Sequence, residues 1–307
     1  MFDNVNFWID RAVILGGKPF DIAPYLSEVA EHQNGQGYSC TGKLKNYSIF
    51  IHESGVSLKG SLPKNYLGDN LHTLTRQDTK QAIEELSTSL HTDIGGAKVT
   101  RLDVSTVIQT KRQPSDYYPH LGNKPHFGRL QVHADTLQYN NHQRQIIFYD
   151  KIKEANAKGV QIPDVFKDSN LLRYELRYTK RLNKQLGVDL TAAKLYETDF
   201  YRSVIRSWYD EFKEIQKLKK QGFMTDDINT PKEAEAALFA TLLQEKGQGY
   251  IDEYLAELKA KNTFKERQRY YELKRKLNTI LQAPKGEQSG LIEELETAIF
   301  DIARYAR

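Results

Sequence analysis

An aspartate in the middle of a predicted strand is the first residue whose presence calls for a chemical reason. In VTRLDVST (residues 99–106), two-residue alternation places Arg101, Asp103 and Ser105 on one face of the strand. Aspartate is disfavoured inside strands, whereas a carboxylate is a natural ligand of Mg²⁺ or Mn²⁺. The pattern therefore indicates either a metal ligand at Asp103 or an Arg101–Asp103 ion pair on a solvated sheet face.

A second predicted strand repeats this design. In LLRYELRY (residues 171–178), Arg173, Glu175 and Arg177 lie on one face and apolar or aromatic residues lie on the other. Glu175 fits a second metal ligand, with the two arginines binding phosphate. The same three residues also fit a surface ladder of cross-strand ion pairs, and the sequence leaves both interpretations open.

A histidine and an aspartate stand two residues apart in RLQVHADTL (residues 129–137). If this stretch is a single strand, Gln131, His133 and Asp135 point in the same direction. A mixed nitrogen and oxygen site for a divalent ion would use His133 and Asp135. A structural histidine explains the pattern equally well.

Tyr149 ends an apolar run just before a charged helical stretch, in QIIFYDKIKEANAK (residues 145–158). A tyrosine held rigidly there, with Lys151 nearby to stabilise its phenolate, can attack a phosphodiester and become covalently attached to DNA. Because the pKa of an unperturbed phenol is about 10, such a tyrosine needs a cation or a general base. The alternative is an ordinary aromatic residue that anchors the start of a helix.

The elements that must position these residues have an α+β pattern. Alternation and turn signals predict strands at residues 5–10, 38–40, 46–52, 55–60, 98–108, 128–137, 145–150 and 171–179. Apolar spacing predicts helices at residues 21–33, 77–91, 198–220, 231–245, 249–261, 263–281 and 288–306. Long loops are expected at residues 61–70 and 113–127. We therefore expect a mostly antiparallel sheet and a helical C-terminal part, divided into residues 1–222 and 223–307.

Composition narrows the function class. The chain has 307 residues, 39% of them hydrophobic and 27% charged, so it is neither a disordered nor a membrane protein by composition. Its one cysteine, Cys40, excludes an internal disulfide framework. A formal net charge of +4 permits a nucleic-acid partner without requiring one. Phosphate-loop, dinucleotide-binding, serine hydrolase and zincin motifs are missing, and the start of the chain does not read as a signal peptide.

Taken in order, four segments of the chain resemble the rolling-circle replication initiators of filamentous phages and related phage and plasmid proteins, the gene II/X family. The segments are LKGSLPKNYLGDN (58–70), TRLDVS (100–105), FYDKIKE (148–154) and LRYELRYTKRLNKQLG (172–187). The resemblance implies a nicking domain of the HUH-like, Rep type. It also implies site-specific nicking and rejoining of one DNA strand at an origin, through a 5′-phosphotyrosyl intermediate.

The resemblance also assigns roles to residues. Tyr149 would be the nucleophile, Asp103 and Glu175 would hold Mg²⁺ or Mn²⁺, and Lys151 would support the phenolate or the scissile phosphate. His133 and Asp135 fall where family members supply a further metal ligand. Related plasmid initiators carry their tyrosine in a Thr-x-x-Tyr stretch, which makes Tyr139 a rival nucleophile. The cations expected to hold DNA phosphates are Arg101, Arg173, Arg177, Lys180, Arg181 and Lys184.

The implied partners are single- and double-stranded origin DNA together with a host polymerase and helicase, in the cytoplasm of a bacterial host and away from membranes. Two alternatives stay open at this point. A relaxase that mobilises a plasmid or integrative element would use the same chemistry. A non-catalytic DNA-binding regulator would use the same scaffold without it.

Overall fold

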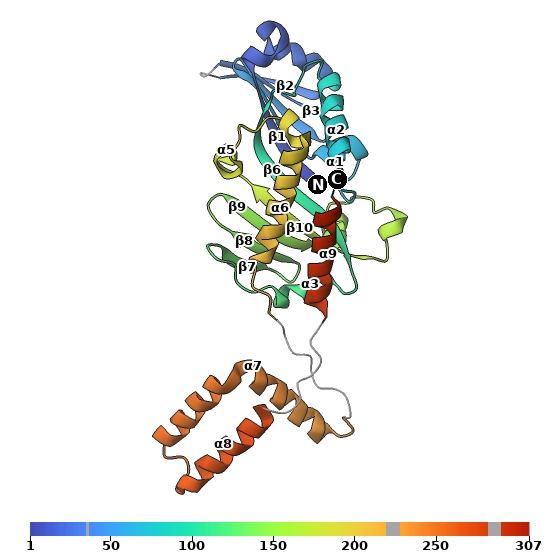
Figure 1. The fold of residues 1–307 in the computed structure, drawn as a ribbon. Coiled ribbons are helices and arrows are strands. Elements are labelled where there is room, and N and C mark those ends of the chain that lie inside the picture. Colours follow the sequence, from blue (N-terminus) through green and yellow to red (C-terminus); the bar gives the residue numbers. More distant parts are fainter. Residues whose placement is uncertain (35–36, 219–227, 282–289, 307) are drawn as a thin grey trace. The chain divides into compact units, whose positions relative to one another are not determined.

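The computed structural model describes residues 1–34, 37–218, 228–281 and 290–306, which fall into two compact units. The first unit comprises Met1–Gln216 together with Glu294–Arg307, and the second comprises Lys217–Glu293 (Figure 1). The last helix, α9 (Leu291–Tyr305), thus joins the first unit over most of its length. Its Glu294 accepts hydrogen bonds from the Tyr117 hydroxyl and the Lys111 backbone N–H. The boundary predicted at residue 222 would assign α9 to the helical C-terminal part, whereas the structure packs most of α9 on the first unit.

The described part of the first unit is built on one antiparallel sheet of ten strands, in the order β2-β3-β4-β5-β1-β6-β10-β9-β8-β7. This architecture and the helices around it confirm the α+β class. The strands are β1 (Phe2–Asp10), β2 (Ser27–Asn34), β3 (Gly37–Leu44), β4 (Tyr47–His52), β5 (Gly55–Lys59), β6 (Lys98–Thr110), β7 (Gly128–Val132), β8 (Thr136–Asn140), β9 (Arg144–Asp150) and β10 (Asn170–Tyr178).

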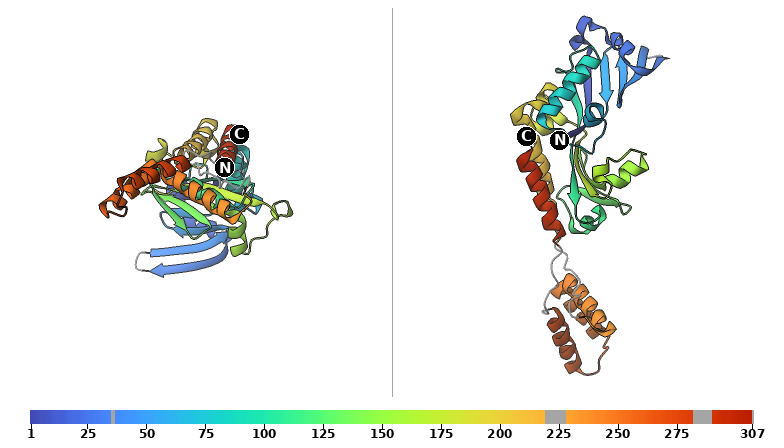
Figure 2. Two further views of the ribbon diagram at one scale, coloured as in Figure 1. Left: turned by 90° about the horizontal axis from the view of Figure 1, so that it is seen from below. Right: turned by 90° about the vertical axis from the view of Figure 1, so that its right-hand side faces the viewer.

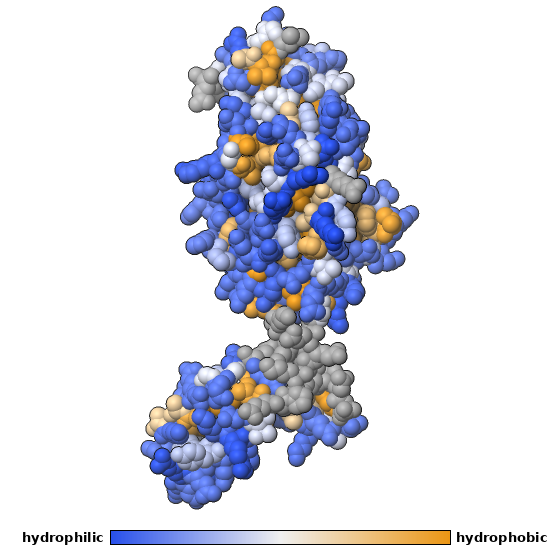
Figure 3. Space-filling model, in the orientation of Figure 1, coloured by the Kyte–Doolittle hydropathy of each residue, from blue (hydrophilic) through white to orange (hydrophobic). Residues whose placement is uncertain are grey.

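Different helices pack on the two faces of the sheet. Helix α6 (Thr198–Lys213) and α9 lie along one face, and α4 (Lys151–Ala157) lies on the other (Figures 1 and 2). On the α6 side, Tyr174 of β10 stacks between Phe148 and Trp208, with ring centroids 4.7 and 4.6 Å away. The outer surface on the α6 and α9 side is largely hydrophilic (Figure 3). The strand residues that alternate with this aromatic core therefore point to the opposite face, called the polar face below.

The predicted helix at residues 21–33 is wrong. Residues 19–25 (Pro19–Tyr25) form a short 3₁₀ segment, and the residues that follow form the edge strand β2, which pairs with β3. Pro24 inside the segment has no N–H to donate, which opposes continuation as an α-helix. The residues of β2, SEVAEHQN, include good helix formers, but hydrogen bonding to β3 outweighs that preference.

The single strand predicted at residues 128–137 is also wrong. The structure has a hairpin there, β7 and β8, with His133, Ala134 and Asp135 in the turn between the strands. His133 has a φ of 53°, in the left-handed region that reverses the chain. His133 and Asp135 are therefore turn residues and do not share a strand face.

The two predicted loops contain short helices. Helix α1 (Leu62–Leu67) follows Ser61, whose hydroxyl accepts a hydrogen bond from the Lys64 backbone N–H and caps the helix. Helix α3 (Pro114–Tyr117) lies in the second loop. Two more helices lie near the sheet, α2 (Arg76–Ser89), where a helix was predicted, and α5 (Leu182–Leu186).

The second unit contains two described helices, α7 (Pro231–Ala260) and α8 (Arg267–Leu281). Gly247 has φ 77° and ψ −177°, so α7 consists of two helical pieces, as the separate predictions at residues 231–245 and 249–261 indicated. Leu243, Ile251 and Leu277 meet in a small core of this unit. The predicted boundary at residue 222 lies outside the described residues. In the described part of the chain, no helix is long and apolar enough to cross a membrane.

Candidate functional site

Several of the residues singled out in the sequence meet on the polar face of β6, β10 and β9. Directly opposed residues of neighbouring strands point to the same side of a sheet. The opposed pairs on this face are Asp103 and Arg177, Ser105 and Glu175, and Arg173 and Tyr149. The register therefore gathers two carboxylates, two guanidinium groups and one phenol from three strands.

The two carboxylates converge on one arginine. Arg177 Nε lies 2.7 Å from Glu175 Oε1 and 3.8 Å from Asp103 Oδ2. Asp103 also accepts hydrogen bonds from Arg101 Nη2 at 2.7 Å and Asn4 Nδ2 at 3.0 Å. Burial raises the pKa of Asp103 to about 7, because the hydrogen bond from Arg101 offsets it only in part and the charge of Glu175 adds to it. Asp103 and Glu175 thus form a buried pair of carboxylates.

Tyr149 is the phenol of the cluster. Its hydroxyl donates to Glu175 Oε2 at 3.4 Å, and its side chain is partly exposed. Burial raises the pKa of the phenol above its ordinary value, and the positive charge of Arg173 opposes that rise. In the resting arrangement the hydroxyl therefore keeps its proton.

Two hollows open beside Tyr149. The smaller, about 280 Å³, is lined by Asn4, Asn70 and Glu175 among others. The larger, about 500 Å³, reaches the β7–β8 turn with His133 and Asp135. Four residues line both hollows: Tyr149, Glu154, Lys158 and Arg177. Tyr149 is thus accessible to a ligand bound in either hollow, as a reacting side chain must be.

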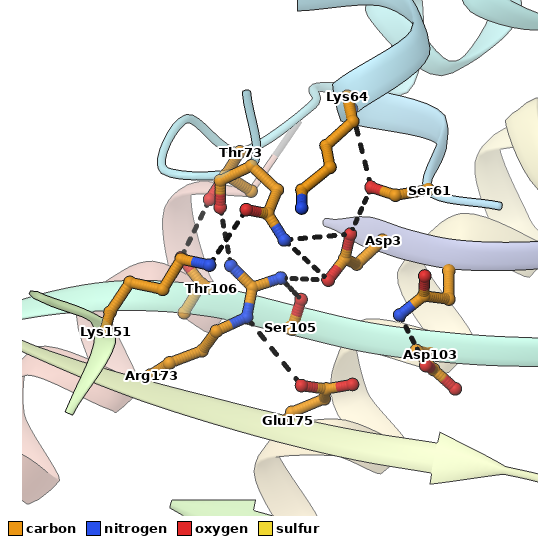
Figure 4. A network of polar contacts seen from close by, with 12 residues as sticks. Asp3, Ser61, Lys64, Thr73, Asp103, Ser105, Thr106, Lys151, Arg173 and Glu175 are labelled. Atoms are coloured by element: carbon orange, nitrogen blue, oxygen red, sulfur yellow. Dashed lines mark hydrogen bonds and ion pairs between the residues drawn. The ribbon is translucent and has the colours of Figure 1, made fainter. Parts of the chain in front are cut away.

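Arg173 is buried at the centre of a polar network (Figure 4). Its Nη2 forms an ion pair with Asp3 and donates to Ser105 Oγ at 2.6 Å, and its Nη1 donates to the Asn70 carbonyl at 2.6 Å. Only 3% of its side chain is exposed. These contacts occupy the guanidinium inside the protein, so the predicted binding of a DNA phosphate by Arg173 does not fit the structure.

Lys151 belongs to the same network. Its ammonium donates to Asn70 Oδ1 at 2.8 Å and to Glu154 Oε2 at 2.7 Å, and the residue is buried. Burial lowers the pKa of this ammonium, since its bonds to Glu154 compensate only in part. Lys151 is directed at Asn70 and Glu154, and Arg173 is the cation whose charge acts on the Tyr149 phenol.

The rival tyrosine lies on the other side of the sheet. Tyr139 of β8 is opposite Ile146, on the face covered by α6, and is fully buried. Its hydroxyl donates to the carbonyls of Leu121 at 3.1 Å and Gly122 at 2.8 Å. The structure therefore places Tyr139 away from Asp103 and gives its hydroxyl a structural use.

The other predicted residues are ion-paired or exposed. Asp135 forms an ion pair with Lys153 at 2.5 Å, and His133 is exposed in the turn. Arg101 remains partly exposed while bound to Asp103. The exposed cations near α5 are Lys180, Arg181 and Lys184.

Sequence reasoning missed Asp3 and Asn70, which bind Arg173 and Lys151. Asn70 ends the segment LKGSLPKNYLGDN and the loop predicted at residues 61–70, and the sequence assigned it no role. Strand β1 extends the predicted strand by three residues, to Phe2, and so includes Asp3. Two-residue alternation would place Asp3 with the apolar Val5 and Phe7, and a register shift between Phe2 and Val5 breaks that pattern. Alternation therefore provides no signal for Asp3, whose partner Arg173 lies 170 residues away.

The site offers the donor set of one kind of metal centre. Mg²⁺ is often held by one or two carboxylates together with water and substrate phosphates. Asp103 and Glu175, both within 4 Å of one cationic atom, Arg177 Nε, fit that pattern. Among the residues that the structure describes, no group of three or more His, Cys, Asp and Glu side chains is placed to hold an ion. A cation here would therefore take its remaining ligands from water and substrate oxygens.

Comparison with known families gives a match that covers this site. Residues 23–199, more than half of the chain, match the family model of the N-terminal part of a phage replication-associated protein, the gene II protein. The matched segment contains Asp103, Tyr149 and Glu175, whereas Asp3 precedes it. No curated protein matches the chain.

Proposed function

The chain belongs to the gene II family of filamentous-phage replication initiators, and from this premise we propose that it nicks and rejoins one DNA strand at a replication origin with Tyr149 as its nucleophile. The observation that supports this most is the position of the Tyr149 hydroxyl. It donates to Glu175, and Tyr149 lines two hollows together with Arg177, a guanidinium that suits a phosphate.

The proposed step is a transesterification. Tyr149 Oη attacks the scissile phosphorus, a phosphorus–oxygen bond to tyrosine forms, and the bond from phosphorus to the 3′-oxygen breaks. Glu175 Oε2, 3.4 Å from the hydroxyl, is positioned to receive the phenolic proton, which ends on the departing 3′-oxygen. The products are a 5′-phosphotyrosyl bond and a free 3′-hydroxyl, which a host polymerase can extend. Attack by a 3′-hydroxyl in the reverse direction rejoins the strand.

Arg177 is the residue suited to bind the reacting phosphate. About a quarter of its side chain is exposed, and it lines both hollows while bonded to Glu175. A guanidinium in that position can donate to non-bridging oxygens as their charge grows. Lys180, Arg181 and Lys184, which are exposed, are proposed to bind phosphates of the flanking DNA.

A divalent cation is part of the proposal. Asp103 and Glu175 would hold Mg²⁺ or Mn²⁺, which supplies charge neutralisation at the phosphate when bound. The convergence of both carboxylates on Arg177 Nε supports this assignment.

The test of this function is a covalent adduct. Labelled single-stranded oligonucleotides that tile the replicon encoding the chain are incubated with the full-length protein and run on denaturing gels. We expect one origin oligonucleotide to give a band that resists detergent and disappears after proteolysis. Binding to origin DNA with no adduct on any oligonucleotide, in the presence of Mg²⁺ or Mn²⁺, would instead indicate the non-catalytic regulator.

Removal of metal gives a separate prediction. We expect chelation with EDTA to slow adduct formation by about 100-fold or more, since a metal contributes several kcal/mol at a phosphoryl centre. Added Mg²⁺ or Mn²⁺ should restore the rate, and the Asp103→Asn variant should no longer respond to either ion. A rate unchanged by EDTA would contradict the metal and leave the tyrosine assignment standing.

A further inference from the structure

The polar face continues beyond the site into the N-terminal half of the sheet. There β1, β5, β4 and β3 turn one side toward α2 and the 3₁₀ segments, and their other side faces away from every described helix of this unit (Figure 2, right). Asn4 of β1 lines the smaller hollow beside Tyr149. Trp8 lies four residues further along the same strand, about 13 Å away at the rise of a β-strand.

Two aromatic residues stand in a row across these strands. The opposed pairs in the row are Lys98 and Trp8, Trp8 and Ser57, Ser57 and Phe50, and Phe50 and Thr41. Trp8 and Phe50 are both partly exposed. The Trp8 ring lies against Gly55 of β5, where an added Cβ would be 2.8 Å from Trp8 Cζ2. The indole is therefore seated on the sheet in a place that only glycine leaves free.

Cations surround this row. A shallow hollow of about 490 Å³ beside Phe50 is lined by Lys43, Lys59 and Glu28 among others. Glu28 forms an ion pair with Lys43 at 2.5 Å. Lys59 and Lys98, which is opposite Trp8, are exposed. The acidic side chain next along β1, Asp10, accepts a hydrogen bond from the Ala12 backbone N–H. The aromatic row is thus bordered by more positive than negative charge.

We propose that this surface, defined by Trp8, Phe50, Lys59 and Lys98, is a platform for the single-stranded DNA that flanks the nicking site. Bases stack on the two aromatic rings, and the lysines contact the phosphates. Stacking on aromatic residues accepts any base, which suits DNA outside the recognised origin sequence. The row alternates aromatic with Ser and Thr side chains, so it lacks the continuous apolar surface of a protein interface. The proposal rests on the proposed function, because it takes DNA as the substrate.

Tryptophan fluorescence tests the platform directly. The chain has two tryptophans, and Trp208 is fully buried, so quenching by DNA reports on Trp8. The full-length Tyr149→Phe variant, which cannot react, is titrated with oligothymidylate, and binding is followed in parallel by the anisotropy of a labelled oligonucleotide. We expect quenching that saturates with binding, and much weaker quenching by duplex DNA. Trp8→Phe should lose the quenching while the Trp208 emission shows that the chain is folded.

Two further variants complete the test. Phe50→Ala should weaken binding of oligothymidylate by about 5- to 150-fold, the range for loss of one base–aromatic contact. Tyr25→Ala is the matched control, because Tyr25 is also exposed but stacks on His91 away from the row, and its affinity should be unchanged. Oligothymidylate that binds by anisotropy without quenching Trp8 would overturn the platform. Failure of covalent attachment with Trp8 quenching intact would instead count against the nicking function alone.

Discussion

Replacing Tyr149 with phenylalanine should abolish covalent attachment to origin DNA, with a fall of at least about 1,000-fold, because the variant lacks the attacking oxygen. The fold should survive, since the change removes only one hydrogen bond, the 3.4 Å contact to Glu175 at a partly exposed position. The measurement is the detergent-resistant band on origin oligonucleotides, with oligothymidylate binding as the control that should not change.

Tyr139→Phe is the matched comparison. It should retain attachment, because Tyr139 lies on the face of the sheet opposite to Asp103 and Glu175. It should also lower the free energy of unfolding by about 1–3 kcal/mol, since it leaves the buried carbonyl of Gly122 without its donor, whereas the Leu121 carbonyl keeps the hydrogen bond from Arg129 Nε. The reverse result, attachment lost in Tyr139→Phe and kept in Tyr149→Phe, would make Tyr139 the nucleophile.

The centre of the site could be predicted because its strands are long and regular. In β6 and β10, two-residue alternation alone shows that Asp103 shares a face with Arg101, and Glu175 with Arg173 and Arg177. The register that brings the two strands together is a property of the folded sheet. The sequence therefore predicted which faces carry the chemistry but did not distinguish a metal site from an ion-pair ladder. The structure shows that Asp103 and Glu175 both form ion pairs with arginines and that both carboxylates lie within 4 Å of Arg177 Nε.

The partners of single side chains were beyond sequence reasoning for a related reason. In the sequence, Arg173 looks like a phosphate-binding residue, since it shares a strand face with the charged residues Glu175 and Arg177. Only the position of β1 in the folded sheet reveals Asp3 beside it. The β7–β8 turn was missed because His133 adopts a left-handed conformation without a glycine or proline to signal it. The edge strand β2 was missed because pairing with β3 outweighs the intrinsic preference of its residues.

The arginine that departs most from its predicted role gives the largest expected effect on stability. Arg173→Met should lower the free energy of unfolding of the first unit by about 3–5 kcal/mol, because it leaves the buried carboxylate of Asp3 without its cation. For a unit of this size we expect the thermal midpoint to fall by about 10 °C. Thermal unfolding followed by circular dichroism measures the change.

The pH dependence of that loss identifies its cause. Burial alone would raise the pKa of Asp3, but the charges of Arg173 and Lys151 and the hydrogen bonds from Ser61 and Asn70 together outweigh it and lower the pKa below its ordinary value of 3.8, with Arg173 contributing most. Asp3 therefore stabilises the wild-type fold above about pH 4, and this contribution is lost as the pH falls through the lowered pKa. In Arg173→Met the same carboxyl should bind a proton more readily, which relieves the uncompensated charge.

The difference in thermal midpoint between wild type and Arg173→Met should accordingly shrink between pH 7 and about pH 4. At pH 7, the double variant Asp3→Asn, Arg173→Met should be more stable than Arg173→Met alone. An equal difference at both pH values would mean that the loss comes from packing rather than from the ion pair.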